Sequence, residues 1–398
     1  MVNGDWCTVS ELGDEVRRLL AERGISLHEA ARLTHYDVSY LSKVVNGRKP
    51  GSRDLAVALD KVLDADGRLA ALTNGHDRRG GVSGIELIEL ARRAEASDVG
   101  SNTLELLTAA VDRMCRDYPV ADSADLSARA AGHLVYVTRL LDGHVTLVQH
   151  RELLVIAGWL AALLACTRYD DGDRQAAETA RVLARQFGTQ AGHAELVAWS
   201  FEIAAWYALV EGRYRQTVEL SEAGLEHAGV TSAAVQITLQ SARGYARLGD
   251  TRARAALNDG HAILNRLPIP EHPEHHFVFD RGKYEFYVAT ILTWLGDDAT
   301  AREHACEVVR QCEAAGGWPT RLGTTLVNLG VIAGRHGDLD EAVSRGAAAL
   351  RLPHRSAELL PRAAELRHAL TARYPGERLV AEYGEILAER AALPAAPP

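Results

Sequence analysis

The most informative stretch of the chain is SLHEAARLTHYDVSYLSKVVNGRKP, residues 26–50. Ser26 and Glu29 have the spacing of a capping box, which predicts a helix that begins just after the serine. A turn then leads to Asp37, which can cap a second short helix, and Gly47 can end that helix. The stretch therefore predicts two short helices joined by a tight turn.

A further helix is expected on each side of this stretch. Before it, Ser10 can cap a helix that Gly24 ends, with its apolar residues on one face. After it, Ser52 can cap a helix that runs to Leu63 and also has one apolar face. Two short helices and a tight turn, flanked in this way, make a helix-turn-helix over residues 10–63.

The same stretch resembles the Xre/lambda-repressor-like helix-turn-helix family and matches its pattern without a gap. The matching residues are Glu29, Ala31, Tyr40-Leu41-Ser42 and the exit Asn46-Gly47-Arg48-Lys49-Pro50. Two positions depart from the pattern. Leu27 stands where the family often has a phosphate-binding glutamine, and His35 stands where the turn usually has glycine. The resemblance implies a domain that binds duplex DNA with its third helix in the major groove.

The resemblance also implies which side chains meet DNA. Bases are expected to face Asp37, Val38, Ser39 and Ser42, and Lys43 is expected to face either a base or a phosphate. Phosphates are expected to face Asn46, Arg48, Lys49 and Arg53. The net charge of the chain is −9, which opposes nucleic-acid binding unless cations are placed locally. From Lys43 to Arg53 the chain has four cations and no acid, a run that is otherwise typical of a solvated exit loop.

Composition indicates a helical protein with more than one structural unit. The 398 residues are 47% hydrophobic and only 6% aromatic, with abundant Ala and Leu, which favours helix over sheet. Five scattered cysteines favour a reducing compartment, so a cytoplasmic location is expected. The most apolar run, Leu153–Cys166, has 14 residues. It is shorter than the roughly 20 that span a membrane, and we interpret it as a buried helix, with no membrane partner.

A glycine recurs through the rest of the chain and suggests helical repeats. It stands at the positions Gly172, Gly212, Gly249, Gly296 and Gly337. The last unit resembles the tetratricopeptide (TPR) repeat through Asn328-Leu329-Gly330, Gly337-Asp338 and Ala342. The expected fold is therefore all-α, a lambda-repressor-like helix-turn-helix domain followed by a TPR-like α-solenoid. We assign residues 1–66 to the DNA-binding domain, 67–84 to a linker and 85–398 to the repeat domain.

A TPR-like body implies a concave face lined by the first helix of each pair. Counting back from each turn glycine places aromatics, amides and charged groups on that face, as in a site for a peptide or an amphipathic small molecule. The expected ligand-binding residues are Trp199, Glu202, Trp206, Gln236, Gln240, Arg243, Lys283, Tyr287 and Asn328. For each tryptophan the alternative is core packing.

One segment breaks the repeat pattern, residues 268–280, with His272, His275 and His276. The histidines lack the spacing of a known zinc site, so we expect no metal and interpret the segment as a loop packed against the groove. The sequence has no phosphate-binding loop, nucleophile elbow or HExxH motif. We therefore expect no enzymatic activity and no cofactor.

Nearly the whole chain resembles a group of actinobacterial Xre–TPR regulators. The resemblance is carried by the helix-turn-helix, the His-containing segment and Trp318-Pro-Thr-Arg321. That resemblance implies a ligand-responsive transcriptional regulator, a homodimer that reads a palindromic operator and responds to a peptide or small-molecule effector. The alternative is an adaptor whose TPR groove binds a partner protein while the head tethers it to DNA. An enclosed, aromatic groove favours the first function, and an open groove with charged walls favours the second.

Overall fold

The computed structural model describes residues 7–73, 97–353 and 356–392. Every regular element in these residues is a helix, which confirms the all-α prediction. The chain divides into two compact units, Met1–Ala94 and Glu95–Pro398, which we call the head and the body. Residues 74–84 of the expected linker lie outside the described residues.

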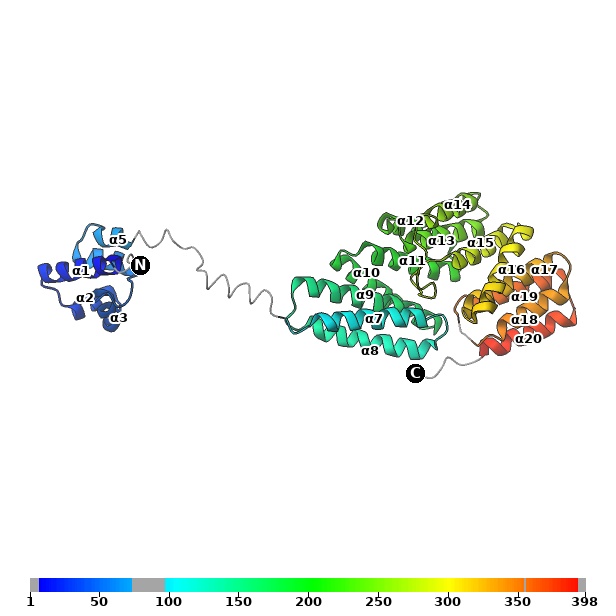
Figure 1. The fold of residues 1–398 in the computed structure, drawn as a ribbon, viewed down its shortest axis with the longest axis horizontal. Helices are drawn as coiled ribbons and strands as arrows, with labels where there is room; N and C mark the ends of the chain where they lie inside the picture. The colour runs from blue at the N-terminus through cyan, green and yellow to red at the C-terminus, as the bar shows by residue number, and fades with distance from the viewer. Residues whose placement is uncertain (1–6, 74–96, 354–355, 393–398) are drawn as a thin grey trace. The chain divides into compact units, whose positions relative to one another are not determined.

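The described part of the head has five helices (Figure 1). They are α1 (Cys7–Arg23), α2 (Leu27–Thr34), α3 (Val38–Val45), α4 (Arg53–Leu63) and α5 (Arg68–Thr73). The expectation that Ser10 caps the first helix is wrong, because α1 begins at Cys7 and Ser10 lies within it. Helices α2, α3 and α4 begin at the caps expected from the sequence. Ser26, Asp37 and Ser52 each accept a hydrogen bond from the backbone N–H three residues later, at 3.0–3.2 Å. The turn between α2 and α3 is made by His35, whose φ of 62° is left-handed, as the departure from glycine required.

Helix α5 extends the head beyond the boundary at residue 66 expected from the sequence. The Asp60 carboxylate on α4 accepts hydrogen bonds from the backbone N–H groups of Leu69 (2.9 Å) and Ala70 (2.7 Å). Leu69 is fully buried in the head core. Residues 68–73 therefore belong to the head and not to the linker. Their cap comes from a residue nine positions away, outside the local signals that mark a helix start.

The body consists of fourteen helices among its described residues. They are α7 (Ser101–Asp117), α8 (Ser123–Leu141), α9 (Leu147–Asp170), α10 (Arg174–Ala191), α11 (Ala194–Val210), α12 (Tyr214–Ala228), α13 (Ser232–Leu248), α14 (Arg252–Leu264), α15 (Arg281–Leu295), α16 (Asp298–Ala315), α17 (Pro319–Arg335), α18 (Leu339–Leu350), α19 (Leu359–Arg373) and α20 (Arg378–Ala392).

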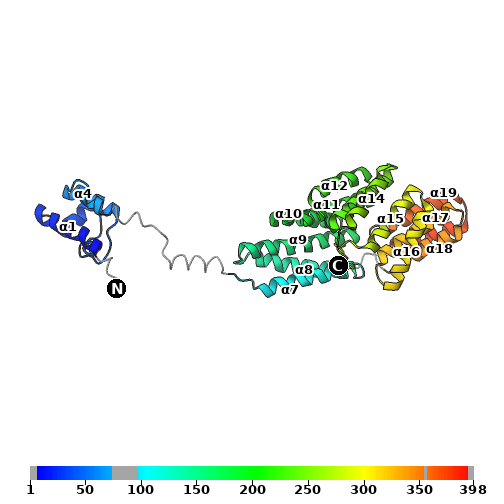
Figure 2. The ribbon, with the colours of Figure 1, turned by 45° about the horizontal axis from the view of Figure 1, so that its top comes forward.

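Consecutive helices pack in pairs, and the first helix of each pair also packs on the first helix of the next pair (Figures 1 and 2). These first helices, α9, α11, α13, α15 and α17, form an inner layer. In α13, 14 of 17 residues are buried, whereas its partner α14 buries only Ala253, Ala256, Gly260 and Leu264. A helix that is buried on nearly all sides must be covered on its concave side as well.

Helix α9 is the one described helix that is long and apolar enough to cross a bilayer. Of its most apolar stretch, 78% is buried inside the body, where Leu160, Leu163 and Cys166 are at most 1% exposed. The interpretation of Leu153–Cys166 as a buried helix is thus confirmed.

Two segments cover the concave side of the inner layer. The first is the insertion loop, residues 265–280, whose Phe277 ring packs between Trp159 (5.1 Å between centroids) and Trp199 (5.2 Å). The second is the crossing segment, residues 356–365, which contains the start of α19. The N–H of Ala357 donates to the Asp170 carboxylate at 2.9 Å, across 187 positions of sequence. The expectation that the insertion packs against the groove matches this placement.

We predict that Phe277 fixes the insertion loop and contributes strongly to the stability of the body. Phe277→Ala should lower the free energy of unfolding by about 3–5 kcal/mol, because it leaves a cavity between two tryptophans. The measurement is denaturant unfolding of the full chain, followed by tryptophan fluorescence.

Ile269→Ala is the matched control, since Ile269 is in the same loop but 89% exposed. Its effect should stay within about 0.5 kcal/mol. Equal effects of the two substitutions would contradict the anchoring role of Phe277.

Candidate functional sites

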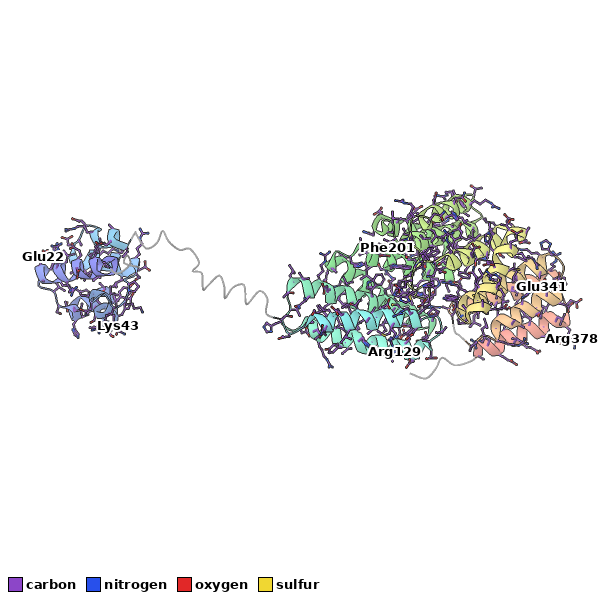
Figure 3. The ribbon with its side chains drawn as sticks, in the orientation of Figure 1. Glu22, Lys43, Arg129, Phe201, Glu341 and Arg378 are labelled. Carbon is purple, nitrogen blue, oxygen red and sulfur yellow. The ribbon has the colours of Figure 1, made fainter. Side chains whose placement is uncertain are left out.

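Seven cations of the head form two groups, one paired with carboxylates and one unpaired. On α1 and α2, Arg17, Arg18 and Arg32 form ion pairs with carboxylates three or four residues away on the same helix. In the described residues, no carboxylate pairs with the four cations of α3 and the segment after it, which are Lys43, Arg48, Lys49 and Arg53. Figure 3 shows Lys43 on α3, apart from Glu22 at the end of α1. This region therefore offers uncompensated positive charge to an anion.

The exit after α3 holds its cations in defined positions. Gly47 has a φ of 66°, and the backbone N–H groups of Arg48 (2.8 Å) and Lys49 (3.1 Å) both donate to the carbonyl of Lys43. The Lys49 ammonium lies 5.0 Å from the centroid of the Tyr40 ring, within cation–π range. Ordered backbone and a stacked side chain reduce the entropy lost when such cations bind phosphate.

Some of the residues expected at DNA have structural roles. The Asp37 carboxylate caps α3, and Val38 is half-buried against the head core. Asn46 donates its side-chain amide to the Ser42 carbonyl at 2.8 Å and so helps to end α3, while its contact with phosphate stays a prediction. Ser42 is half-buried with its hydroxyl near that amide. The side chains left exposed with free polar groups are Ser39, Lys43, Arg48, Lys49 and Arg53.

The second site is a cavity of about 140 Å³ in the body, between the inner helices and the two covering segments. A cavity of about 150 Å³ is large enough for one benzene-sized molecule. Six of the nine predicted ligand residues line it: Glu202, Trp206, Gln236, Arg243, Lys283 and Tyr287. They come from α11, α13 and α15, as the repeat spacing predicted.

The other three predicted ligand residues do not line this cavity and pack between helices. Trp199 is 0% exposed, within the core beside Phe277. Gln240 accepts a hydrogen bond from Arg243 at 3.1 Å. Asn328 donates to Thr290 (3.0 Å) and accepts from Arg362 (2.8 Å), so its polar atoms are satisfied within the protein. Their assignment to a ligand surface is corrected, because the covering segments occupy that part of the concave face.

The cavity is also lined by residues that were not assigned to a ligand site from the sequence: Tyr118, Pro119, Cys166, Phe286, Thr320, Trp318, Arg321, Ser356 and Glu358. The insertion loop was expected against the groove, and it contributes Glu274, His275 and His276. Trp318 has a φ of 57°, which is uncommon for a bulky residue and is found where surrounding contacts hold the backbone. The Arg321 guanidinium lies 4.9 Å from the Trp318 ring and pairs with Asp280 at 3.0 Å. Residues 318–321 contribute to the resemblance seen in the sequence, but no pattern in the neighbouring sequence predicts that they line the cavity.

A hydrogen-bonded chain crosses the cavity wall. The Lys283 ammonium donates to Gln236 Oε1 (3.2 Å) and to the carbonyls of His276 and Val278 (2.9 Å each). Gln236 in turn donates to the Glu202 carboxylate at 2.8 Å. Burial lowers the pKa of Lys283 to about 7 and raises the pKa of Glu202 above its usual value. All three ammonium protons therefore have acceptors within the protein.

The histidines of the insertion loop do not form a metal centre in the described structure. Throughout residues 7–73, 97–353 and 356–392, no three His, Cys, Asp or Glu side chains are grouped closely enough to hold an ion. The His276 ring packs on Tyr118 at 3.9 Å between centroids, and burial lowers its pKa well below the usual value. His272 lies beside Glu274 at 3.2 Å.

A wider groove of about 800 Å³ lies on the other face of the insertion loop. It is lined by residues of α7, α9 and α11, with Trp159 and Phe277 on its floor side. Arg151, Glu152 and Glu195 give it charged walls. It is thus wider than the aromatic cavity, and it too has charged groups on its walls.

Comparison with known proteins identifies the head. Residues 11–72 match the sequence model of a family described as helix-turn-helix domain. The match includes almost all of α5, in agreement with the packing of that helix in the head. No curated protein matches the chain. The chain therefore carries a helix-turn-helix DNA-binding domain at its N-terminus.

We predict that Lys283 titrates near neutral pH. It is the only lysine in residues 95–398, so in protein labelled with ¹³C-lysine one resonance should titrate with a midpoint of about 7. An unfolded lysine has a pKa of about 10.4, so above pH 7 the unfolded chain holds a proton that the folded chain has lost. This lysine should therefore make the body more stable as pH rises, by about 1–2 kcal/mol between pH 7 and 8.5.

Lys283→Arg should remove that resonance, and Lys283→Met should remove that part of the pH dependence from denaturant unfolding. Lys61→Met, in the head, should leave it in place. If all the lysine resonances titrate only near pH 10, the Lys283 ammonium is not buried as described.

Proposed function

We propose that this protein is a sequence-specific DNA-binding transcriptional regulator whose body senses a small molecule or a peptide and shifts the affinity of the head for its operator. The observation that carries the proposal is the set of unpaired cations on α3 and its exit, within a helix-turn-helix domain. The resemblance to the Xre family adds the docking geometry, with the start of α3 in the major groove.

The placement of the cations argues against the exit being only a solvated loop. The four cations from Lys43 to Arg53 have no carboxylate partner among the described residues, whereas α1 and α2 pair Arg17, Arg18 and Arg32 along the same helix. The exposed Ser39 and Lys43 stand one turn apart on α3, where base edges would meet them. Arg48, Lys49 and Arg53 extend the same positive region towards the backbone of the duplex.

The covered concave face favours ligand sensing over a partner-protein adaptor. In a TPR-like body the concave groove is the usual peptide or partner site, but here the insertion loop and the crossing segment occupy it. What remains is a small space of about 140 Å³ with Trp206, Phe286 and Tyr287 on its walls. The wider groove with charged walls is the place where a longer peptide or a partner protein would bind if the adaptor function held.

Further parts of the proposal rest on the resemblance. The protein is expected to act in the cytoplasm as a homodimer that reads a palindromic operator, because a single head of this size buries too little surface for tight specific binding. Ligand binding would alter the spacing of the two heads in the dimer. The coupling free energy between ligand binding and operator binding would be about 1–3 kcal/mol. We propose no enzymatic activity.

We predict that two kinds of substitution in the head separate affinity from specificity. Arg48→Ala and Lys49→Ala should weaken binding to all sequences alike and reduce the salt slope by about one for each lost phosphate contact. Ser39→Ala should change which bases are preferred at one position. Fluorescence anisotropy with a selected operator and a scrambled duplex, over a series of salt concentrations, measures both.

Arg18→Ala is the control for charge, because Arg18 is already paired with Glu15 and Glu22. It should leave the salt slope unchanged. The proposal is wrong if selection from a random duplex library enriches no sequence, or if Arg18→Ala and Arg48→Ala weaken binding equally.

We predict that the full chain is a dimer at about 10 µM, held together mainly by the body. Sedimentation equilibrium should give twice the 43.2 kDa of the chain. A chain truncated before residue 85 should behave in the same way. A monomer in both samples would contradict the dimer and the palindromic operator together.

A further inference from the structure

Arg243 is the most deeply buried cation on the cavity wall. Its side chain is 2% exposed, and its guanidinium lies 5.2 Å from the Tyr287 ring and 5.4 Å from the Trp294 ring. It donates to Gln240 and is paired with Glu358, but its Nε has no hydrogen-bond partner among the described residues. A buried guanidinium with an unpartnered N–H can donate a further hydrogen bond to an anion.

The carboxylate that Arg243 holds comes from a distant part of the chain. Glu358 lies 115 positions away in the crossing segment, and its side chain is 11% exposed. It stands at the start of α19 but makes no capping hydrogen bond to that helix. Its carboxylate therefore pairs with Arg243 and does not cap the N-terminus of α19.

The Arg243–Glu358 pair also divides two cavities. Both residues line the aromatic cavity of about 140 Å³ and a neighbouring cavity of about 230 Å³. The second cavity is bounded by Arg247, Trp294, Arg362 and Glu365. If Glu358 left Arg243, the guanidinium would face a single larger space with an aromatic lining.

We propose that the cavity binds a small aromatic carboxylate, whose carboxylate takes the place of Glu358 on Arg243. Without ligand, the Glu358 carboxylate occupies the position on Arg243 that the ligand carboxylate would take. Its displacement releases the start of α19 from the inner helices. This inference rests on the proposed ligand-sensing function, which it deepens by naming the ligand class and the contact that changes. A bidentate carboxylate would also satisfy the unpartnered Nε of Arg243.

The other charged groups at the cavity are less available to a ligand. Lys283 and Glu202 are joined through Gln236, and Arg321 is paired with Asp280. The size of the space excludes a peptide of several residues from the state described here. The aromatic preference follows from Tyr118, Trp206, Phe286, Tyr287 and Trp318, whose rings offer stacking and edge-to-face contacts.

Calorimetry on the full chain without DNA tests the ligand class with probes of equal shape. Phenylacetate should bind, whereas the neutral phenylacetamide and the cationic phenethylamine should bind at least about tenfold more weakly. The tripeptide Gly-Gly-Phe distinguishes a peptide carboxylate from a small acid and should bind no better than phenylacetamide. Equal binding of the three small probes, or preferential binding of the tripeptide, overturns the proposal.

Substitution of Glu358 tests the displacement. Glu358→Gln removes the competing charge and keeps the shape, so phenylacetate should bind about tenfold more tightly, as expected when a competing state is removed. Glu178→Gln is the matched control. Glu178 also pairs with a buried arginine, Arg181, but it lines neither the aromatic cavity nor its neighbour. Its substitution should leave phenylacetate affinity within about twofold.

Two further measurements keep the test decisive if Glu358→Gln folds poorly. In Glu358→Ala, acetate should raise the melting temperature by replacing the missing carboxylate, and it should not do so in Glu178→Ala. In the wild-type chain, phenylacetate should speed amide hydrogen exchange at residues 359–366. Unchanged or slower exchange there, with phenylacetate bound, would show that Glu358 is not displaced. None of these readouts depends on DNA binding, so they fail or succeed separately from the proposed function of the head.

Discussion

The burial of Arg243 between the inner helices is the constraint on which the architecture of the body depends. A guanidinium with 2% exposure is tolerated only when a carboxylate and other polar groups surround it. Gln240 comes from the same helix, but the carboxylate comes from residue 358. The C-terminal part of the chain must therefore return across the concave face. That return covers part of the inner layer and leaves a cavity of about 140 Å³ where a TPR-like body would have a wide groove.

The head and the body differ in how far their cationic side chains are exposed. In the head, Arg17, Arg18 and Arg32 are exposed and paired along one helix, whereas Lys43, Arg48, Lys49 and Arg53 are exposed and have no carboxylate partner among the described residues. In the body, Arg243, Lys283 and Arg362 are surrounded by protein and meet partners from distant elements. Exposed charges favour long-range attraction to a polyanion, whereas enclosed charges interact strongly over short distances with a matching group. The two units thus suit different partners.

The sequence analysis was most accurate where the signal is local. Ser26, Asp37 and Ser52 cap the helices they were expected to cap, since a cap and its N–H lie three residues apart. The repeat spacing placed six cavity residues, because helix periodicity determines which side chains share a face. It failed at Trp199 and Asn328, because that face is covered by segments the repeat pattern does not describe.

By itself, the sequence determined the all-helical class, the helix-turn-helix register, the inner layer of repeat helices and the buried character of α9. All of these follow from caps and from periodicities shorter than two helical turns. Only the tertiary structure decided that Asp60 caps α5, that Phe277 fills the space between two tryptophans and that Glu358 reaches Arg243. These contacts join residues between 9 and 118 positions apart. Their energy depends on burial, which exists only after the helices have packed.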